Sequence, residues 1–500
     1  MTFKQLAARV FARFVHWKAS RWMHRPVQAQ QWVFRDLIRQ GSRTAFGKDH
    51  RFSEIQDHAD YVARVPVRDY EDLKPYVERI LEGQPDVLWP GKPLYMAKTS
   101  GTTSGAKYIP LTRGAIREQV RASRNAILAY IHQTGNTAFV VGKMIFLQGS
   151  PELTDKNGIK VGRLSGISAH YVPGYLQKNR LPSWETNCIE DWEEKVDRIV
   201  EETLEKPMSV IAGIPSWVQM YFERLVQRSG KPVGQLFPQF ELFIYGGVNY
   251  EPYRAKFEEL IGRKVDSIEL FPASEGFFAY QDRQDDRGLL LLLDSGIFYE
   301  FIRADEFHDP DQERLTIGQV ELGVNYVMIL STNAGLWGYN LGDTVAFTSL
   351  DPYRVIVTGR IKHFISAFGE HVIAKEVEYA MQDALGRCGG QVNEFTVAPM
   401  ISPPEGGLPY HEWWVEFEAL PRDMEAFVKT LDQALQGQNS YYFDLIEGRV
   451  LQRLKIRHVA KGGFREYMKS VGKLGGQNKV QRLSNDRKLA EGLAPFQHKP

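Results

Sequence analysis

Cysteine is scarce in this 500-residue sequence, which has only Cys188 and Cys388, far apart in the chain. Two distant thiols exclude a disulfide framework and a thiolate zinc site, and they suit a reducing compartment. We expect both to be inert core thiols.

Long apolar runs and an excess of either charge are also missing. The longest apolar run is LLLLL at 289–293, far too short to cross a bilayer. The 62 basic and 61 acidic residues leave a net charge of +1, so nothing indicates a phosphate-backbone or acidic partner. We therefore expect a cytoplasmic protein with neither nucleic acid nor a membrane as a partner.

What is present is ordinary globular composition, with 43% apolar and 12% aromatic residues. A chain of 500 residues is too long for one hydrophobic core, which favours two or more domains.

The first fifty residues are locally basic. This segment contains ten Lys and Arg residues, and its only acidic residues are Asp36 and Asp49. Such an excess of basic residues is typical of a targeting peptide or of a segment that touches a membrane surface. We favour a packed helix instead, because Trp32, Val33, Leu37 and Ile38 continue a helical pattern.

From about residue 138 the chain alternates apolar strand-like and helical segments. The pattern predicts a strand at 138–147, a strand, turn and helix at 209–225, and further strands within 239–247 and 266–276. This alternation is typical of an α/β domain whose ligands lie beyond the carboxyl ends of its strands.

The pattern changes near residue 360. Strand-like segments near 363–368, 394–399, 411–420 and 454–460 and helical segments near 373–385 and 423–435 give a β-α-β-β-α-β order, enough for a compact second domain. We predict an α/β fold with a large domain at 1–360, a smaller mobile α+β domain at 364–500, and a hinge at about 360–363.

The stretch KTSGTTSGAK at 98–107 is rich in glycine and hydroxyl residues, and a helix-like run follows it. Such residues let the backbone approach a ligand and donate hydrogen bonds to phosphate oxygens, and Lys107 adds a positive charge. The glycine spacing excludes a P-loop. Thr112 is placed to cap the helix that follows.

Serine hydrolase signatures are incomplete. Ser104 and Lys107 match S-x-x-K but lack its companion motifs, and the PASEG stretch around Ser274 has proline in place of the first glycine of a nucleophile elbow. A serine acyl hydrolase using Ser104 or Ser274 stays open as a second enzyme class.

Three stretches after the expected strands carry chemistry that suits a nucleotide. Phe271 has a ring that can stack on a base, and the Glu275 carboxylate suits a magnesium ion. Asp343 can accept the hydroxyls of a ribose, and Arg360 can hold ribose or phosphate.

The ordered set TSGTTSGAK, YGG, FPASEG, YNLGD and GRIKHFISAFGE resembles the adenylate-forming superfamily. More closely, SRTAFGKDHRFSEI, AGIPSW and GGQNKVQRLSN resemble its Gretchen Hagen branch, the auxin and jasmonate acyl acid amido synthetases and their bacterial relatives. The resemblance spans almost the whole chain. Asn340 departs from it, because the third motif of the superfamily commonly has arginine there.

The resemblance implies ATP and Mg²⁺ as cofactors, and a role for each matching residue. ATP phosphates would be held by Ser100, Gly101, Thr102, Thr103 and Ser104. The adenine would lie along Gly246 and Gly247 and stack on Phe271, Ser274 would approach the α-phosphate or the acyl carboxylate, Glu275 would bind magnesium, Asp343 and Arg360 would contact the ribose, and Lys479 would be a mobile catalytic lysine.

The activity that the resemblance implies is ATP-dependent activation of a carboxylic acid as an acyl-adenylate and its transfer to an amine, usually an amino acid. An acyl-coenzyme A ligase and a non-catalytic nucleotide-binding protein also stay open. Trp217, His170 and Tyr171 are candidates for lining the acyl pocket, although each also fits ordinary packing.

Overall fold

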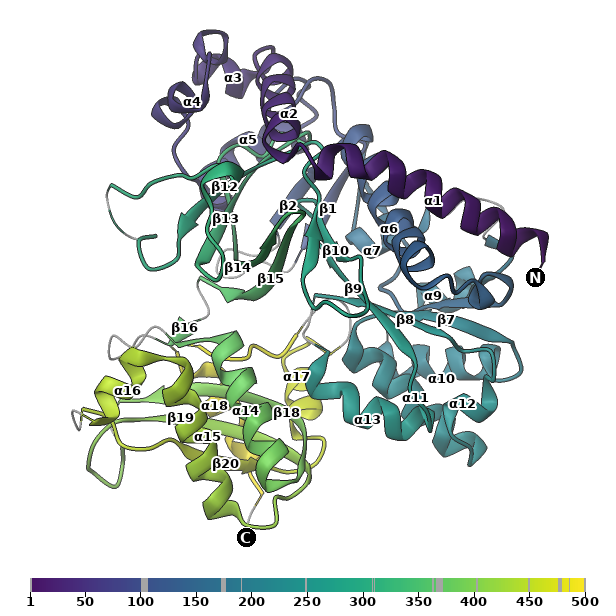
Figure 1. Cartoon of the computed structure of the whole chain (residues 1–500), viewed down its shortest axis with the longest axis vertical. Coiled ribbons are helices and arrows are strands. Elements are labelled where there is room, and N and C mark those ends of the chain that lie inside the picture. The colour runs from purple at the N-terminus through teal and green to yellow at the C-terminus, as the bar shows by residue number, and fades with distance from the viewer. Residues whose placement is uncertain are drawn as a thin grey trace. The chain divides into compact units, whose positions relative to one another are not determined.

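The computed structural model is a mixed α/β protein with a large N-terminal and a smaller C-terminal domain (Figure 1). It describes residues 2–99, 107–171, 177–189, 191–247, 250–307, 309, 311–361, 364–365, 372–401, 403–447, 450–474, 479–484 and 486–498. Contacts divide the chain into a unit formed mainly by 1–250, 255–341 and 345–356, and a second unit of 251–254, 342–344 and 357–500.

Helices dominate the first eighty residues of the large unit. They are α1 (Phe3–Met23), α2 (Pro26–Gly41), α3 (Ala45–Asp49), α4 (His58–Arg64) and α5 (Tyr70–Leu81). Next to them lies a four-stranded sheet in the order β2-β1-β5-β4, made of β1 (Tyr95–Thr99), β2 (Lys107–Leu111), β4 (Thr154–Lys156) and β5 (Ile159–Gly162). The interior of this region is aromatic, with Trp337 and Phe46 fully buried.

The expected packed helix in the basic segment is α2, whose Val33, Leu37 and Ile38 are buried. Trp32 is the exception, with 67% of its surface exposed. The prediction for Trp32 was wrong because the buried face of α2 is formed by Val33, Phe34, Leu37 and Ile38, which recur at helical spacing and leave position 32 outside.

An eleven-stranded sheet forms the centre of the large unit, in the order β12-β13-β14-β15-β11-β10-β9-β8-β7-β3-β6. One end of it is parallel and consists of β3 (Lys143–Phe146), β6 (Arg180–Leu181), β7 (Met208–Ala212), β8 (Leu242–Gly246) and β9 (Asp266–Pro272). The other strands are β10 (Phe277–Gln281), β11 (Leu289–Leu291), β12 (Ile297–Arg303), β13 (Asn325–Thr332), β14 (Tyr339–Leu350) and β15 (Tyr353–Arg360).

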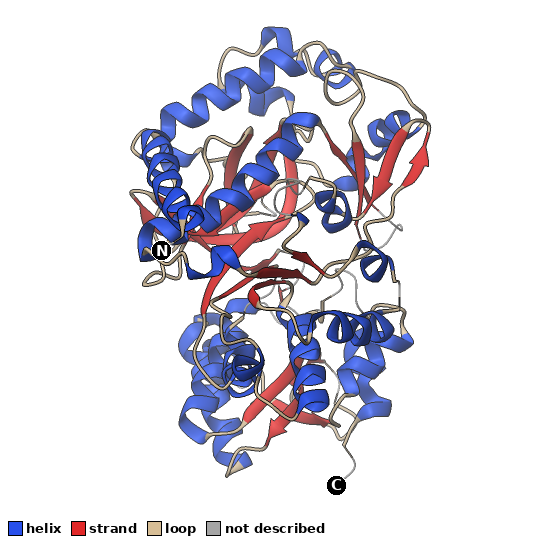
Figure 2. Ribbon diagram, turned by 90° about the vertical axis from the view of Figure 1, so that its right-hand side faces the viewer, coloured by secondary structure: helices blue, strands red, loops and turns tan. Residues whose placement is uncertain are grey.

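Helices cover both faces of the parallel end (Figure 2). They include α6 (Arg113–Thr134) on one face and α13 (Glu251–Ile261) on the other. The helices between these two in the chain are α7 (Leu164–Ala169), which packs on β1, and α9 (Trp184–Cys188), α10 (Trp192–Thr203), α11 (Pro215–Ser229) and α12 (Val233–Leu236). Successive side chains of β8 point to opposite faces, so Leu242 and Ile244 join the core below α6 and α1, while Phe243 packs 5.1 Å from Phe257 of α13.

The predicted strand at 138–147 is only half present. Residues Ala138–Val141 form a short 3-10 turn, and the strand begins at Lys143. Ser209 donates a hydrogen bond to the carbonyl oxygen of Phe139 at 2.7 Å, which engages this carbonyl outside any strand ladder. The segments at 209–225, 239–247 and 266–276 form β7 with α11, β8 and β9, as predicted.

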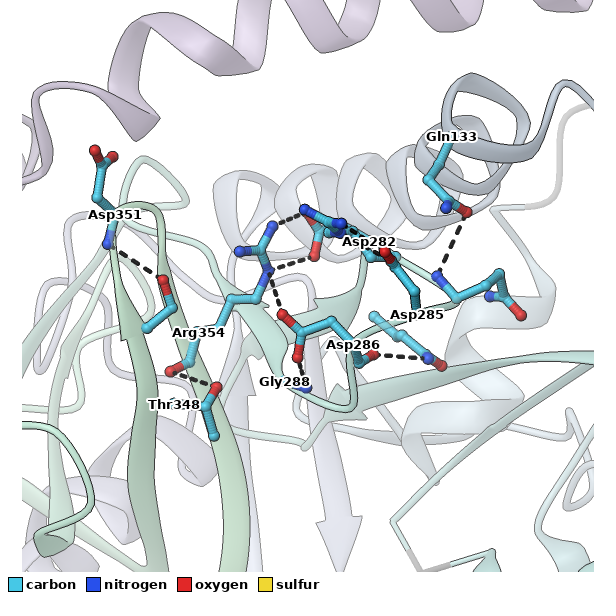
Figure 3. A network of polar contacts seen from close by, with 12 residues as sticks. Gln133, Asp282, Asp285, Asp286, Gly288, Thr348, Asp351 and Arg354 are labelled. Carbon is cyan, nitrogen blue, oxygen red and sulfur yellow. Dashed lines mark hydrogen bonds and ion pairs between the residues drawn. The ribbon is translucent and has the colours of Figure 1, made fainter.

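An ion pair joins the antiparallel strands of the sheet. Arg354 of β15 binds Asp282, which follows β10, through two parallel hydrogen bonds of 2.9 and 2.8 Å (Figure 3). Arg354 is buried, and its bonds to Asp282 are the first cause that raises its pKa above the usual arginine value. The bidentate pair therefore holds β15 against the β10–β11 connection.

The smaller unit contains a three-stranded sheet, β18-β19-β20, and a separate hairpin of β16 and β17. Its elements are β16 (Phe364–Ile365), β17 (Val372–Ile373), α14 (Ala374–Cys388), β18 (Gln391–Met400), β19 (Tyr410–Ala419), α15 (Met424–Gln438), α16 (Ser440–Glu447), β20 (Lys455–Val459), α17 (Gly463–Ser470) and α18 (Lys488–Leu493). The predicted element order is present, although the first predicted strand pairs outside the main sheet.

Candidate active site

The carboxyl ends of three parallel strands meet at one edge of the large sheet. Ala212 of β7 is level with Ile244 of β8, and Gly246 of β8 is level with Leu270 of β9. The segments that follow these strands therefore begin side by side, which is where an open α/β sheet binds its ligands.

Gly246 allows β8 and β9 to end in close contact. A β-carbon at this position would lie 2.5 Å from the carbonyl oxygen of Leu270 and 3.2 Å from the ring of Pro272. The next residue, Gly247, has φ of +77°, a conformation that side chains other than glycine rarely adopt. Gly246 and Gly247, which were predicted to lie along the adenine, are thus at the carboxyl edge of the parallel strands. Close packing at Gly246 and the positive φ of Gly247 each favour glycine.

The FPASEG stretch forms a tight hairpin between β9 and β10. Ala273 and Gly276 exchange backbone hydrogen bonds of 2.7 and 3.3 Å, which leaves Ser274 and Glu275 at the tip. Gln119 of α6 donates to the carbonyl oxygen of Ala273 at 3.0 Å and anchors the hairpin. Ser274 is buried, whereas Glu275 is partly exposed.

Tyr339, the first residue of β14, reaches this hairpin. Its hydroxyl donates a hydrogen bond to Oε1 of Glu275 at 3.3 Å. The Tyr339 ring is buried, and burial followed by the negative charge of Glu275 raises the pKa of its hydroxyl well above the usual tyrosine value. Tyr339 therefore stays a neutral donor at physiological pH and orients the carboxylate.

The start of β14 is held in place by the strand-like segment at Arg68. The Arg68 amide donates to the carbonyl oxygen of Gly338 at 2.9 Å, and the Asn340 amide donates to the carbonyl oxygen of Arg68 at 2.7 Å. Asp343, four residues beyond Tyr339 on the same strand, is buried and follows Gly342, which has φ of +84°.

A buried ion network of Glu300, His58 and Arg314 contacts the segment that precedes Arg68. Glu300 of β12 contacts His58 at 2.7 Å and Arg314 at 2.5 Å. Burial alone would raise the pKa of Glu300, but the charge of Arg314 and the bond to His58 hold that pKa below its usual value. Arg314 also donates to the carbonyl oxygen of Val65, three residues before Arg68.

The donor set at the hairpin fits a magnesium ion that is shared with a substrate. Among the residues that the structure describes, no three His, Cys, Asp or Glu side chains gather as a protein-only metal site. Magnesium in nucleotide enzymes is held by one or two carboxylates together with substrate phosphates. A single partly exposed carboxylate at Glu275 fits that mode.

The glycine-hydroxyl loop lies outside the described residues, and with it Ser100, Gly101, Thr102, Thr103 and Ser104. Its flanks are described: Thr99 of β1 pairs with Lys107 of β2, and Nζ of Lys107 lies 5.5 Å above the ring of Tyr70. Thr112 caps α6 as predicted, accepting from the Ala115 amide at 3.1 Å.

The other predicted ligands of the nucleotide are spread over both units. Phe271 is buried against Phe278 in the core of the large unit. Arg360 ends β15, and its side chain lies outside the described part of the chain. Lys479 is exposed in the smaller unit. Their roles remain predictions.

The three candidates for the acyl pocket are Trp217, His170 and Tyr171. In the described part of the chain, each makes its recorded contacts with other residues. Trp217 is buried with its ring 4.4 Å from Trp192. His170 contacts the carbonyl oxygen of Pro151 at 3.0 Å. Tyr171 packs edge-on against Tyr95, and burial, followed by its bond to Tyr95, raises its pKa above the usual tyrosine value.

Sequence reasoning missed Tyr339, Gln119 and Arg68 as supports of the site. Tyr339 stands directly before the Asn340–Asp343 stretch, so its position in the motif was visible. Its partner Glu275 is 64 positions away along the chain, and a single sequence carries no signal for such a pairing.

Comparison with known families gives matches in three successive parts of the chain. The GH3 family N-terminal domain matches residues 18–187, the central domain matches 290–360, and the C-terminal domain matches 375–488. The chain belongs to the GH3 family.

The relatives of this chain include an amido synthetase and an L-amino acid synthetase, both at low identity. The indole-3-acetic acid-amido synthetase GH3.3 of Arabidopsis thaliana is 20% identical over 88% of this chain and 86% of its own. The jasmonoyl–L-amino acid synthetase JAR4 of Nicotiana attenuata is 20% identical, and the match spans 63% of this chain and 66% of that protein.

Solved structures confirm the fold over nearly the whole of this GH3 chain. The GH3.15 acyl acid amido synthetase superimposes with a TM-score of 0.77 at 15% identity, covering 94% of both chains. A 2-hydroxyisobutyryl-CoA ligase captured with an acyl-AMP superimposes with a TM-score of 0.57 at 14% identity, covering 95% of this chain and 91% of that one. The fold is that of adenylate-forming enzymes.

Proposed function

We propose that this chain is an ATP-dependent acyl acid amido synthetase, which adenylates a carboxylic acid and transfers the acyl group to an amine, with an amino acid as the expected acceptor. The observation that carries the proposal is the ordered match of all three GH3 domains, combined with an acidic hairpin at the carboxyl edge of the parallel strands. Relatives with names that specify amido synthesis support the choice of acceptor.

The chemical difficulty lies in the carboxylate, which resists nucleophiles because its charge is delocalised and oxide is a poor leaving group. Attack of the carboxylate oxygen on the α-phosphate of ATP expels pyrophosphate and forms an acyl-adenylate. The amine then attacks the acyl carbon, AMP leaves, and the amine loses a proton. No covalent bond to a side chain is needed.

The residues at the edge of the sheet supply position and charge. Glu275, oriented by Tyr339, would hold a magnesium ion that offsets the phosphate charge. The phosphates would be held by Ser100, Gly101, Thr102, Thr103, Ser104 and Lys107. Ser274 would approach the α-phosphate or the acyl carboxylate. Gly246, Gly247 and Phe271 would contact the adenine, and Asp343 and Arg360 the ribose.

The second half-reaction would need the smaller domain. We propose a boundary at 360–363 between a domain of 1–360 and a mobile domain of 364–500, whose rotation would precede the transfer of the acyl group. In the adenylation step, the same domain would bring Lys479 to the phosphates. For the acid, Trp217, His170 and Tyr171 stay candidates for the pocket.

A second candidate is an acyl-coenzyme A ligase, favoured by the shared fold with the 2-hydroxyisobutyryl-CoA ligase. The two are separated by offering ATP, magnesium and pooled carboxylic acids with either mixed amino acids or coenzyme A, and by identifying products by mass. An amide with release of AMP supports the proposal. A thioester formed in preference to any amide would replace it with the ligase, and release of ADP would contradict both.

A further inference from the structure

Helix α1 presents two different faces, although only one of them packs on the protein. The inner face carries small residues, Ala12 and Ala19, which are buried against α6 and the parallel strands. Among the described elements, α6 is the main neighbour of α1, and α1 lies along the outside of the large unit with no element drawn beyond it (Figure 1). The opposite face is therefore open.

The open face is a continuous apolar stripe. With 3.6 residues per turn, positions 3, 6, 10, 14 and 17 fall within an arc of about 80°, opposite the buried alanines. All five are large apolar residues with much of their surface exposed: Phe3 85%, Leu6 48%, Val10 62%, Phe14 54% and Trp17 54%. Five large apolar side chains in one exposed row are unusual on a protein surface and mark an interaction site.

Basic residues border this stripe on both sides, and α1 contains no acidic residue. On the helical wheel Arg9 and Arg13 lie along one side and Lys4 and Lys18 along the other, while Arg21 continues the stripe itself. Arg21 stacks 4.1 Å over the ring of Trp17, so its charge lies at the end of the apolar row.

This arrangement selects among possible occupants. A second copy of α1 would bring two acid-free, positively charged helices together, and the charges would repel. An anionic lipid surface offers acyl chains to the stripe and negative headgroups to the bases on both flanks, and an aromatic apolar face bordered by Lys and Arg is the composition of helices that lie in a membrane interface.

We propose that α1 is a docking helix that binds this protein to the surface of an anionic phospholipid membrane. The contact is peripheral, since no helix in the described part of the chain is long and apolar enough to span a bilayer. The proposal departs from the expectation of no membrane partner, because the net charge of the whole chain conceals the local charge of its first helix. It does not depend on the proposed catalytic activity.

The test is flotation of the full chain with vesicles of phosphatidylcholine alone or of phosphatidylcholine and phosphatidylglycerol at 7:3, in low and high salt. We expect flotation with the anionic vesicles at low salt, and its loss in the double variant Phe14→Ser/Trp17→Ser. The matched control Phe443→Ser/Leu420→Ser, which removes two exposed apolar side chains elsewhere, should float like the wild type.

The charge contribution is measured separately. Each positive charge near an anionic membrane strengthens binding by about fivefold. The variant Arg13→Gln/Lys18→Gln removes two charges and should therefore bind anionic vesicles about 25-fold more weakly than the wild type. Because all four altered residues of α1 are exposed, each variant should keep the thermal midpoint of the wild type.

Three results would overturn the proposal. They are absence of flotation with anionic vesicles at low salt, equal binding to neutral vesicles, and a concentration-dependent dimer that the Phe14→Ser/Trp17→Ser variant abolishes, since that dimer would make a second copy the occupant.

Discussion

The hydroxyl of Tyr339 donates a hydrogen bond to Oε1 of Glu275 at 3.3 Å, and this contact joins the first residue of β14 to the hairpin after β9. The two residues belong to different parts of the large sheet, and Tyr339 is buried whereas Glu275 is partly exposed. A buried neutral donor fixes the orientation of a partly exposed carboxylate, so that the carboxylate can bind a substrate or a metal ion.

Replacing Tyr339 with Phe should slow the adenylation step without unfolding the protein. Loss of one hydrogen bond to a charged group costs about 1.5–3 kcal/mol. The rate of adenylation, measured as acid-dependent exchange of labelled pyrophosphate into ATP, should therefore fall by roughly 10- to 100-fold. The raised pKa of Tyr339 keeps the hydroxyl protonated, and the wild-type rate should therefore show no dependence on tyrosine ionisation below about pH 9. A Tyr326→Phe control alters another buried tyrosine, whose hydroxyl accepts from the Glu321 amide, and should keep the rate. Equal rates in all three proteins would remove Tyr339 from the site.

Gly246→Ala should damage both stability and nucleotide binding. The new methyl group would lie 2.5 Å from the carbonyl oxygen of Leu270, so the ends of β8 and β9 must separate. We expect the free energy of unfolding to fall by about 1–3 kcal/mol and the affinity for ATP to fall with it. Urea denaturation and calorimetric titration measure the two effects.

Gly386→Ala is the matched control for Gly246→Ala. Gly386 lies within α14, and a β-carbon there would have no neighbour within 4 Å. Alanine in that position should stabilise the protein by about 0.5–1 kcal/mol. If Gly246→Ala proved as stable as the control, the close approach of β8 and β9 would have no energetic role.

Arg314→Met should unfold the protein at a much lower urea concentration. It leaves Glu300 buried with His58 as its remaining ion-pair partner, and breaking a buried pair costs about 3–5 kcal/mol. The control Arg303→Met breaks the exposed pair with Glu321 and should leave the urea midpoint nearly unchanged. Similar midpoints for both variants would contradict the account of the buried network.

The strands of the parallel end could be predicted because their evidence is local. β7 ends at Ala212, β8 ends at Gly246, and β9 ends at Pro272, just before the small residues that precede Glu275. Gly246 and Glu275 were found because they stand at or just after these strand ends. In the second domain, α14 was predicted from one apolar face, and of that face Val377, Ala380 and Met381 are buried, whereas Ile373 and Leu385 are partly buried. Local periodicity is enough for such elements.

The order of the eleven strands could not be predicted in the same way. The Tyr339–Glu275 bond and the Arg354–Asp282 pair join residues 64 and 72 positions apart, and a single sequence records neither pairing. Burial was also misjudged where a large side chain lay beside the apolar row of a helix: Trp32 is exposed, because the neighbouring branched residues and Phe34 form the packed face of α2.

Acid should weaken the attachment of α1 to α6 through a pair of histidines. His16 and His132 stack with ring centres 3.9 Å apart. Both side chains lie at the surface, and the partial burial of their rings lowers the pKa of both below the usual 6.5; the charge of His16 lowers the pKa of His132 further. At a pH between the usual and the lowered pKa, the unfolded chain binds more protons than the folded one. The contribution of this pair to the free energy of unfolding is therefore complete above pH 6.5 and is lost as the pH falls through the lowered pKa.

Urea midpoints measured from about pH 8 to about pH 5 test this pair. The wild type should lose stability below pH 6.5, and His132→Asn should lose less over the same range. Some slope should remain, because burial also lowers the pKa of His50 and His458. An unchanged slope in His132→Asn would show that the stacked pair does not contribute.

The central claim is reversible adenylation at the edge that carries Glu275. The most direct measurement is exchange of labelled pyrophosphate into ATP, dependent on a carboxylic acid and magnesium, for the wild type and Glu275→Ala. With pooled aromatic, aliphatic and amino acids and no acceptor, we predict exchange by the wild type and a loss of at least about 100-fold in a folded Glu275→Ala protein. Exchange that survives Glu275→Ala would contradict the assignment of the metal, and a wild-type protein that neither exchanges nor binds ATP would contradict the account as a whole.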